Sequence, residues 1–583
     1  MNSENLQTLR HSCSHVLAAA VLKLYPKTKL GIGPAIDEGF YYDFQFPKSV
    51  NEEELEKISA SMMQIIKAKI PFEKEEITIV QAKKLFNDQP YKLELIDDLA
   101  KEENKKVSIY KTGVFVDLCA GPHVTDTGQI GAFKLLSLAG AYWRGSEKNT
   151  MLTRIYGTCF KNKKELDEYL WQLEEAKKRD HRKIGQMLDL FSFHPEAPGD
   201  IFWHPKGLFL VNKLSQYWRK EHAKNGYVEV RTPVILTRGI WDRSGHTSFF
   251  IDKIYKVQTP DAKDWNMAVK PMNCDGHILI YKNKSHSYKE FPLRMAELGI
   301  VHRFESSGEV LGILRPREFT QDDAHIFCTP GQVKDELKRI IDLCFNFYRT
   351  FNLNLDHLEL STRPEKSIGS SEIWERAEKI MKQVLEEKNV PFQINEGEGA
   401  FYGPKFDFHL RDSIGRTWQC STIQLDFAQP ENFDLTYVNE QGKKERPVMI
   451  HRVIYGSIER FLGILIEQYA GVFPLWLSPV QAVIIPITDK QNSYGEKILE
   501  ELISGGIRAE QDKRNETTSA KIRDAELQKV PYMVIVGEKE VKAKNLSVRA
   551  RGETCLPAGR KDLGQMTLEK FIAKIKSEIE NKA

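Results

Sequence analysis

The spacing of apolar residues along the chain predicts two helices before residue 200. From about Glu52, apolar side chains recur at helical intervals, so one face of a helix should be buried. These side chains are Leu55, Ile58, Met62 and Ile65. A second, highly charged helix is expected from Lys163 to about Leu190, with a narrow apolar stripe formed by Leu166, Leu170 and Leu173. Ordinary packing explains such a stripe, and residues 161–190 are interpreted as a helical connector.

Alternating apolar and polar residues predict a β-hairpin near the middle of the chain. β-branched and aromatic residues flank the segment 306–308 and indicate two strands, over 300–305 and 319–328, with a loop between them. Arg303 and Glu305 alternate with apolar neighbours and should share one face, and Arg315 follows where the chain returns. Arginines over one sheet face suit the phosphates of a nucleotide. Solvated surface arginines would give the same pattern.

After Pro474 and Pro479 short apolar strands alternate with helices. Strands over 480–487, near Ile507 and over 531–536 predict a small α/β sheet, with helices reaching about 503 and spanning 521–527. A basic cluster follows, consisting of Lys539, Lys542, Lys544, Arg549 and Arg551. A charge run of this kind is usually a solvated face, and RNA contact is the alternative.

Length and composition indicate a multidomain globular protein. A chain of 583 residues exceeds the size at which a single hydrophobic core stops growing. A net charge of +3 argues against a wholly basic nucleic-acid binder, so any RNA contact must come from local patches. Eight cysteines in this length are not a disulfide framework, which favours a reducing compartment. With no apolar run near the ~18 residues of a membrane span and no signal peptide, the expected location is the cytoplasm.

Residues 1–160 are predicted to form an α+β unit that carries a histidine and cysteine set. His11 and His15 stand four residues apart on the first helix and therefore share a face. A strand from Val114 should run into a turn that presents Cys119 and His123. These donors suit zinc, while histidines that cap a core are the structural alternative.

Elsewhere, spacing alone assigns no metal site and no familiar nucleotide loop. Cys274, His325 and His451 lie too far apart in sequence for any zinc-finger pattern. No glycine-rich phosphate loop occurs, which argues against P-loop and Rossmann nucleotide binding.

Four stretches together resemble the threonyl-tRNA synthetases, a family of class II aminoacyl-tRNA synthetases. They are Lys270–Cys274, the hairpin ending in Phe319–Phe327, Gly399–Lys405, and Met449–Arg452 leading into Gly456–Phe461. The likeness covers nearly the whole chain and implies an α+β multidomain fold. Its parts would be an editing domain over 1–160, a catalytic domain with an antiparallel sheet over 183–474, and an α/β anticodon-binding domain over 475–583. The family's small N-terminal ubiquitin-like domain is expected to be absent.

The resemblance implies a ligase reaction. ATP and threonine would form threonyl-adenylate, and the threonyl group would then pass to tRNA(Thr). Charge neutralisation around the α-phosphate is required and no side-chain nucleophile is needed. The implied catalytic set is Arg303, Glu305, Arg315 and Arg460, and Gln419 joins these four in binding ATP with Mg²⁺.

The resemblance also groups a metal set and a substrate set. Cys274, His325 and His451 would hold one zinc ion per subunit, with a fourth position open to the amino and hydroxyl groups of threonine. Asp323 would accept the hydroxyl, and Gln321 and Tyr402 would hold the amino group. The whole threonine-binding set is Met272, Gln321, Asp323, Tyr402, Lys405 and Gln424.

Selectivity arguments call for a second, hydrolytic site. A site that coordinates a hydroxyl rejects valine strongly, by about 10⁴–10⁵. Serine keeps the hydroxyl and lacks only a methyl, worth roughly 1–3 kcal/mol, so some serine would be charged. By resemblance, mischarged seryl-tRNA is hydrolysed without metal in the N-terminal domain. The implied editing residues are His11, His15, Cys119 and His123, with Asp117, Tyr42 and Lys92 lining the cleft.

Further implications concern partners. Gly226–Pro233 resembles class II motif 1, which lies at a dimer interface, so a homodimer is expected. The anticodon-reading candidates are Asn515, Arg523, Glu540 and Arg549. Another class II synthetase, such as the prolyl or seryl enzyme, and a non-catalytic RNA-binding relative are the rival interpretations. The first rival would not need the cysteine and two histidines. The intact arginines Arg303 and Arg460 argue against the second.

Three residues depart from the family pattern. Asp275 stands in place of a proline, Leu311 in place of a histidine and Ala120 in place of an arginine. Neither Asp275 nor Leu311 is expected to touch a proposed metal ligand.

Overall fold

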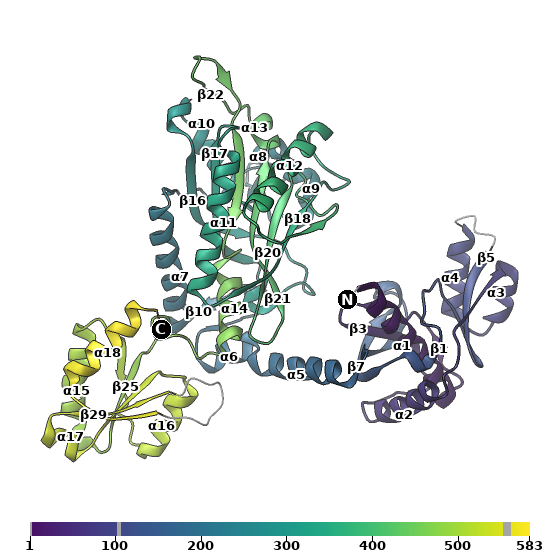
Figure 1. The fold of residues 1–583 in the computed structure, drawn as a ribbon, viewed down its shortest axis with the longest axis horizontal. Helices are drawn as coiled ribbons and strands as arrows, with labels where there is room; N and C mark the ends of the chain where they lie inside the picture. Colours follow the sequence, from purple (N-terminus) through teal and green to yellow (C-terminus); the bar gives the residue numbers. More distant parts are fainter. Residues whose placement is uncertain (1–2, 102–105, 552–560, 583) are drawn as a thin grey trace. The chain divides into compact units, whose positions relative to one another are not determined.

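The computed structural model describes residues 3–101, 106–551 and 561–582. The chain forms two compact units, Met1–Glu174 and Glu175–Ala583. In Figure 1 the first unit is drawn in purple to blue and the second in blue through green to yellow. No helix among the described residues is long and apolar enough to cross a membrane.

In the first unit, helix α1 (Ser3–Leu24) packs on an antiparallel sheet. Its buried face, which includes Cys13 and Leu17, contacts Phe40 and Ile155 of the sheet. The strands of this sheet are β1 (Lys29–Leu30), β2 (Ala35–Ile36), β3 (Gly39–Gln45), β7 (Ala132–Tyr142) and β8 (Met151–Phe160). Helix α2 (Glu54–Lys67) buries Leu55, Ile58 and Met62, so the predicted amphipathic helix is present.

A second, smaller sheet in this unit carries β4 (Glu73–Thr78), β5 (Lys106–Thr112) and β6 (Phe115–Leu118). Helices α3 (Ile79–Leu85) and α4 (Pro90–Lys101) accompany it. The chain leaves β6 directly into the turn that bears Cys119 and His123.

The charged segment predicted as one helix is in fact two helices. Helix α5 spans Lys163–Arg179 and α6 spans His181–Met187. Asp180 has φ −47° and ψ 117°, which is not helical, and its carboxylate accepts a hydrogen bond from the Arg182 backbone at 2.8 Å. Because Asp180 caps α6 in this way, the prediction of an unbroken helix is wrong.

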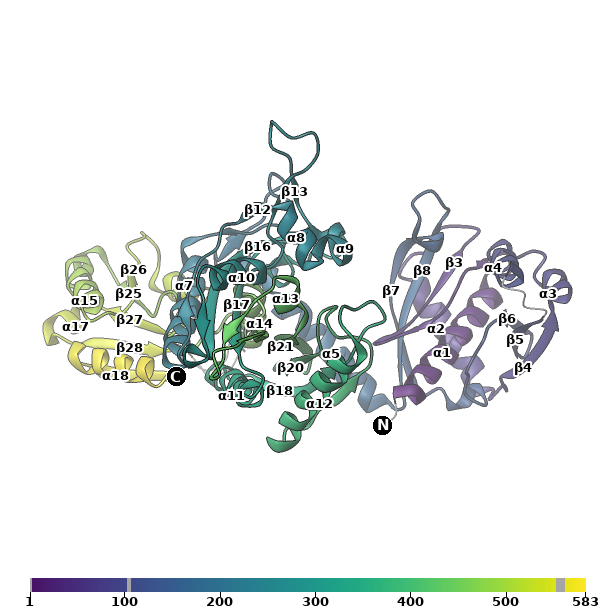
Figure 2. The same ribbon diagram turned by 90° about the horizontal axis from the view of Figure 1, so that it is seen from above.

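The second unit is built around an eight-stranded sheet with the order β11-β16-β17-β24-β21-β20-β18-β19. The six central strands pair antiparallel, as predicted, while the edge strands β11 and β19 pair parallel to their neighbours. Helices α11 (Val333–Thr350), α12 (Ser371–Glu387) and α14 (Ile458–Tyr469) cover one face (Figures 1 and 2). The strand bounds are Val228–Glu229 (β11), Leu293–His302 (β16), Glu318–Cys328 (β17), Asn354–Ser361 (β18), Gln393–Asn395 (β19), Lys405–Arg411 (β20), Thr417–Asp426 (β21) and Val448–Val453 (β24).

The predicted hairpin is present as β16 and β17, but its first strand is shorter than expected. Strand β16 ends at His302, and the Glu305 backbone then turns back to donate to the Arg303 carbonyl at 2.8 Å. Arg303 and Glu305 therefore lie in the loop after the strand, and the prediction that they alternate along a strand is wrong.

The C-terminal part folds as a five-stranded sheet with the order β26-β25-β27-β28-β29. Strands β25 (Ala482–Pro486), β26 (Ala509–Gln511) and β27 (Tyr532–Val536) are parallel, whereas β28 (Leu546–Ala550) and β29 (Lys561–Met566) are antiparallel. Helices α15 (Asn492–Ser504) and α18 (Leu568–Glu580) pack with one set of buried side chains, and α16 (Thr518–Leu527) with the other. The strand predicted near Ile507 begins two residues later.

Candidate functional site

Strand register lines up the candidate ligands on one face of the large sheet. His325 of β17 is paired with His451 of β24, and His451 is paired with Gln424 of β21. Residues at alternate positions of a strand point to opposite faces. Ala324 and Ile326 face the helices in the hydrophobic core, so His325 and Asp323 face the other way.

A cavity of about 260 Å³ opens on this face, and we call it the histidine cavity. All three predicted metal ligands and five of the six predicted threonine-binding residues line it. The lining from these two sets is Met272, Cys274, Gln321, Asp323, His325, Tyr402, Gln424 and His451. Lys405 is absent from this lining, because its Nζ pairs with the Asp407 carboxylate at 2.8 Å.

The two histidines of the predicted metal set are oriented by other side chains. His325 Nδ1 lies 2.9 Å from Nδ1 of His277 on α10 (Cys274–Lys282). His451 Nε2 lies 2.8 Å from Asp426 Oδ2. These contacts leave Nε2 of His325 and Nδ1 of His451 as the ring nitrogens available to a metal.

A chain of polar contacts continues behind His277. Its Nε2 lies 3.1 Å from Glu297 Oε2, and Lys270 Nζ lies 3.3 Å from Glu297 Oε1. Burial alone would raise the pKa of Glu297, but the hydrogen bonds from His277 and the Thr232 backbone and the Lys270 charge hold it at about 2. An ionised Glu297 thus fixes His277, which in turn fixes His325.

Cys274 is buried at the start of α10, and it contacts Asp275, which stands where the family usually has a proline. Its thiol lies 3.7 Å from Asp275 Oδ1, so the expectation that Asp275 touches no proposed ligand is wrong. Burial and then the Asp275 charge raise the pKa of Cys274 well above its usual value. The donor atoms of Cys274, His325 and His451 are also not all within 4.8 Å of one another, unlike those of three other clusters among the described residues.

A second cavity of about 390 Å³ holds the predicted ATP-binding residues, and we call it the arginine cavity. Its lining includes Arg303, Glu305, Arg315, Gln419 and Arg460. Arg315 donates to Glu305 Oε2 at 3.0 Å, and Arg460 donates through Nε to the Gln419 carbonyl at 3.0 Å. The arginine and histidine cavities share Arg303, Gln321, Thr422 and Val453 in their linings.

Sequence reasoning missed several residues of these cavities. Thr422 and Val453 line both, and Asn273 donates from Nδ2 to Asp323 Oδ2 at 3.2 Å. His277 and Asp426, which contact His325 and His451, were also not predicted. Asn273 lies within the stretch Lys270–Cys274 and could have been predicted from it, whereas the others depend on which elements become neighbours.

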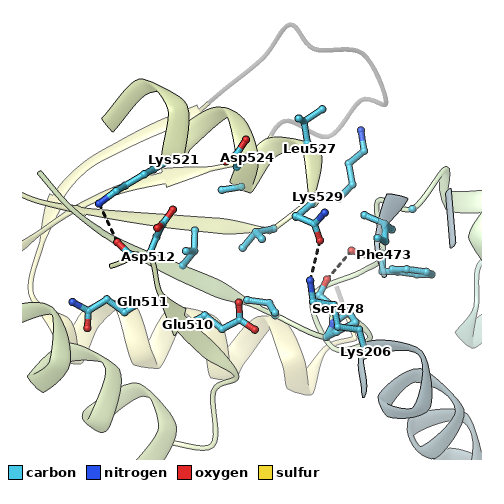
Figure 3. A pocket seen from close by; sticks show the side chains of 18 of the residues that line it. Lys206, Phe473, Ser478, Glu510, Gln511, Asp512, Lys521, Asp524, Leu527 and Lys529 are labelled. Carbon is cyan, nitrogen blue, oxygen red and sulfur yellow. Dashed lines mark hydrogen bonds between the residues drawn. The ribbon is translucent and has the colours of Figure 1, made fainter. Parts of the chain in front are cut away.

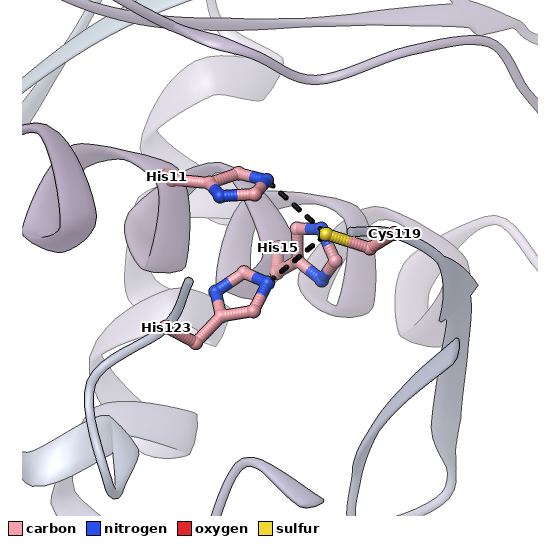
Figure 4. Close-up of side chains that lie close together, drawn as sticks. All are labelled: His11, His15, Cys119 and His123. Carbon is pink, nitrogen blue, oxygen red and sulfur yellow. Dashed lines mark hydrogen bonds between the residues drawn. The ribbon is translucent and has the colours of Figure 1, made fainter. Parts of the chain in front are cut away.

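In the first unit, the predicted histidine and cysteine set gathers at one point (Figure 4). His11 and His15 extend from α1 toward the turn after β6, which carries Cys119 and His123. The Cys119 sulfur lies 3.3 Å from Nε2 of His11 and 3.3 Å from Nε2 of His123. The donor atoms of all four side chains lie within 4.8 Å of one another, so the geometry is compatible with a metal as well as with a metal-free pocket.

Asp117 connects this cluster to the three weaker candidates. Tyr42 donates to Asp117 Oδ2 at 2.6 Å, and Lys92 Nζ lies 2.5 Å from Oδ1. His15 Nε2 lies 3.7 Å from the same carboxylate. Ala120, the departure beside this turn, is exposed.

Burial keeps the cluster uncharged. It lowers the pKa of His11 and His15, and with the neighbouring imidazoles it lowers that of His123 to about 2. It also raises the pKa of Cys119 to about 11. The cluster therefore offers neutral imidazoles and a protonated thiol at pH 7. A thiolate nucleophile is disfavoured, and hydrogen bonding or general-base action by histidine is favoured.

The anticodon-reading candidates lie on and around the C-terminal sheet. Asn515 follows β26 and Glu540 follows β27, at the same edge of the parallel strands. Arg549 of β28 is opposite Met533, which packs beneath α16, and Arg523 is on α16. Arg551 of the basic cluster donates instead to the Phe473 carbonyl at 2.8 Å.

A further cavity lies beside α16. It has a volume of about 510 Å³ and is bordered by α16, β26 and the segment 478–480 (Figure 3). Some of its charged side chains pair with one another. Arg514 contacts Asp512 at 2.6 Å and Asp524 at 2.7 Å, and Lys521 donates to the Asp512 carbonyl at 3.1 Å. None of the predicted site residues lines it.

Three protein-family models match the chain. The tRNA synthetase class II core domain (G, H, P, S and T) matches residues 255–469, and the anticodon binding domain matches residues 481–578. The threonyl and alanyl tRNA synthetase second additional domain matches residues 107–156.

Known proteins resemble the chain over most of its length. The threonine–tRNA ligases of Carboxydothermus hydrogenoformans and Clostridium tetani are each 54% identical to it across all of this chain, which spans 90% and 89% of theirs. A crystal structure titled the RNA binding domain of threonyl-tRNA synthetase from Cryptosporidium parvum superimposes with a TM-score of 0.64 at 38% identity. A putative threonyl-tRNA synthetase from Aeropyrum pernix gives a TM-score of 0.59 at 30% identity. The two structures cover 68% and 69% of this chain, which covers 98% and 97% of theirs.

Proposed function

Because the chain belongs to the threonyl-tRNA synthetase family and is a threonine–tRNA ligase, we propose that the histidine and arginine cavities are its threonine and ATP sites. The enzyme activates threonine with ATP, transfers it to tRNA and edits mischarged tRNA. The observation that carries the proposal is the shared lining of the two cavities. A carboxylate bound in one can reach a phosphate bound in the other only where the cavities meet, at Arg303 and Gln321.

In the histidine cavity, zinc would be held by Cys274, His325 and His451. The donor set suits the ion, because one sulfur and two imidazole nitrogens with an open fourth position are typical of non-structural zinc sites. When bound, zinc supplies a Lewis-acidic position for the amino and hydroxyl groups of threonine. The donor atoms of Cys274, His325 and His451 are not all within 4.8 Å of one another, so they must move closer together to bind one ion.

Asp323 is the proposed partner for the threonine hydroxyl. Its carboxylate is buried on the cavity wall and is held by Asn273, which leaves acceptor capacity for a substrate hydroxyl. Valine would leave Asp323 unpaired, and an unsatisfied buried polar group is costly. Gln321 and Tyr402 are proposed to hold the amino group. Tyr402 already donates to Gln424 Oε1 at 2.5 Å, which orients its ring.

In the arginine cavity, charge neutralisation is the proposed chemistry. Arg303 and Arg460 would contact the phosphates with Mg²⁺, while Arg315, Glu305 and Gln419 position the nucleotide. Arg303 is held by the Pro271 carbonyl at 3.2 Å and lies over the Phe319 ring. It is therefore oriented before ATP binds, which lowers the cost of reorganisation during the reaction.

Editing is proposed at the cluster of Figure 4. His11, His15, Cys119 and His123 would position the terminal adenosine of tRNA and a water molecule, without a metal. Tyr42, Lys92 and Asp117 would line the cleft. Neutral imidazoles are suitable proton acceptors for that water, and the extra methyl of threonine would be excluded sterically.

The remaining proposals concern domains and partners. The proposed limits are 1–160 for editing, 161–190 for the connector, 183–474 for catalysis and 475–583 for anticodon binding. Asn515, Arg523, Glu540 and Arg549 are the proposed base-reading residues. We also propose a homodimer through the motif 1 segment, and a cytoplasmic location.

The test of the two-cavity proposal is ATP–pyrophosphate exchange that depends on threonine. The wild-type enzyme should show exchange with threonine and far less with valine. Exchange driven equally by proline or serine would identify another class II specificity, and no exchange with any amino acid would rule out the catalytic assignment.

A further inference from the structure

A second set of metal-ligating side chains lies on the large sheet, separate from both cavities. It consists of His357 and Glu359 on β18 and His409 on β20, and we call it the β18–β20 cluster. Their donor atoms all lie within 4.8 Å of one another. None of these residues lines the histidine or arginine cavity.

Strand geometry explains why the three side chains meet. His357 and Glu359 are two positions apart on β18 and so point to the same face. His409 is directly opposite His357 in the antiparallel pair, where side chains approach most closely. The neighbours Leu358 and Phe408 point the other way into the hydrophobic core. The cluster is therefore held on the face away from the helices, with each side chain about one-fifth to one-quarter exposed.

The donor atoms of the cluster lie close together. His357 Nδ1 lies 2.8 Å from Asp356 Oδ2, which leaves Nε2 as the ring nitrogen that could bind a metal. That Nε2 lies 3.4 Å from Glu359 Oε1. His409 Nε2 is buried, and the polar atom facing it is Glu359 Oε2 at 3.4 Å. A cation bound between these atoms would pair with both histidine nitrogens and the carboxylate at once.

The distances fit a metal better than a simple contact. Donors about 2.0–2.1 Å from a tetrahedral zinc-like ion lie roughly 3.3 Å apart, close to the two nitrogen–oxygen distances of 3.4 Å. The imidazole rings are stacked, with centroids 4.3 Å apart and an angle of 8° between them. To share one ion they must tilt toward each other, which the broad second torsion of histidine allows.

Hydrogen bonds to neighbouring side chains orient two of the three ligands. Asp356, which contacts Nδ1 of His357, also accepts from Arg411 Nε at 2.6 Å. Glu359 Oε2 accepts from Asn395 Nδ2 at 2.9 Å. Metal-bound histidines usually donate their other nitrogen to a carboxylate in this manner.

We propose that His357, Glu359 and His409 form a binding site for a first-row transition-metal dication. Two imidazoles and a carboxylate are donors that Zn²⁺, Co²⁺ and Ni²⁺ share. The bound ion would join β18 to β20. This site is independent of the zinc site proposed in the histidine cavity.

Cobalt is the best probe because the other candidate metal clusters that contain histidine pairs also contain a cysteine. A thiolate ligand adds a sulfur-to-cobalt charge-transfer absorption, which a site of two histidines and one glutamate lacks. The full-length enzyme should be dialysed against Co²⁺, and bound cobalt should be counted alongside the absorption spectrum. The comparison is with His409→Gln and His357→Gln, which remove one ligand from each strand in turn.

The matched control is His204→Gln. His204 is also a partly exposed histidine whose Nδ1 lies 2.6 Å from a carboxylate, that of Asp189, but it is not part of the cluster. Circular dichroism and the thermal midpoint in EDTA check that each variant is folded. Asp356→Asn keeps all three ligands and tests the contact between Asp356 and His357. Cobalt affinity should fall by about 10–100-fold.

The wild type and His204→Gln should each hold one more Co²⁺ than either cluster variant, and the additional ion should lack the sulfur absorption. The thermal midpoint should rise with Co²⁺ in the wild type more than in the cluster variants. Equal cobalt content and equal affinity in the wild type, His409→Gln and His357→Gln would overturn the proposal. If either His357→Gln or His409→Gln fails to fold, the comparison is made with the other variant, whose substitution is on the neighbouring strand.

Discussion

His277 Nδ1 lies 2.9 Å from His325 Nδ1, so a residue outside the predicted metal set holds one of its members in place. His277 is in turn fixed by Glu297 at 3.1 Å. Replacing His277 by asparagine should weaken zinc binding by about 10–100-fold, because the His325 ring loses its orienting partner. The measurement is zinc affinity by competition with a chelator.

His286→Asn provides the control for that experiment. His286 is equally buried, and its Nε2 lies 3.0 Å from the Tyr281 carbonyl rather than a proposed ligand. Its zinc affinity should match the wild type. Unchanged affinity in His277→Asn as well would mean that His277 does not position His325.

Arg303 lies where the histidine and arginine cavities meet, so its loss should affect activation more than metal binding. Arg303→Ala should reduce threonine-dependent ATP–pyrophosphate exchange by roughly 100-fold or more, because a preoriented charge near the α-phosphate is removed. Zinc content should be unchanged. Exchange at the wild-type rate, or loss of zinc in step with activity, would argue against this assignment of Arg303.

Substitutions in the first unit should impair editing without impairing the charging of tRNA with threonine. A His11→Ala/His15→Ala variant should charge threonine at nearly the wild-type rate but accumulate seryl-tRNA, because hydrolysis loses its positioning imidazoles. Aminoacylation with labelled serine and threonine measures both. Rapid hydrolysis of seryl-tRNA by the variant would place editing elsewhere. A zinc ion lost on this double substitution, beyond one per subunit in the wild type, would mean that the cluster is a metal site.

The same histidines make the first unit sensitive to acid. Burial holds the folded pKa of His11 and His15 below the value of about 6.5 expected in an unfolded chain, and that of His123 at about 2. Below pH 6.5 the unfolded state therefore binds more protons than the folded state, and stability falls as pH decreases. Hydrogen exchange of α1, corrected for intrinsic rates, should give a lower opening free energy at pH 5 than at pH 7.5. The His11→Ala/His15→Ala variant should show a smaller difference, and an identical one would be evidence against this origin.

Anticodon contacts should be separable from activation. Arg549→Ala should raise the KM for tRNA while leaving ATP–pyrophosphate exchange unchanged, because Arg549 is on β28 of the C-terminal sheet. Lys542→Ala, an exposed position on α17 (Glu538–Ala543), is the matched control and should change neither. A loss of exchange in Arg549→Ala would contradict the division of labour between the two regions.

The sequence grouped residues that line one cavity, but it did not identify the side chains that contact them. Motif likeness grouped Cys274, His325 and His451, although they are far apart in the chain. It did not identify His277 or Asp426, because these depend on the pairing of β17 with β24 and on the angle of α10. Strand pairing is set by long-range packing rather than by local pattern.

Local signals also failed where a side chain overrides a periodic pattern. The helix predicted to run from Lys163 to about Leu190 is interrupted at Asp180, whose carboxylate caps a new helix. Likewise, Arg303 and Glu305 have the alternation of a strand but lie in a turn after His302. The β18–β20 cluster could not be predicted from the sequence for a different reason. His357 and His409 are brought together only by strand register.

In the proposed mechanism, the histidine cavity recognises threonine through a metal held by Cys274, His325 and His451. The most direct measurement is amino-acid-dependent ATP–pyrophosphate exchange, with threonine and with valine, in Cys274→Ser and His325→Ala alongside their zinc content. Both variants should lose zinc and threonine activation together. If metal-depleted enzyme still activated threonine and rejected valine as the wild type does, the account of this cavity would be contradicted.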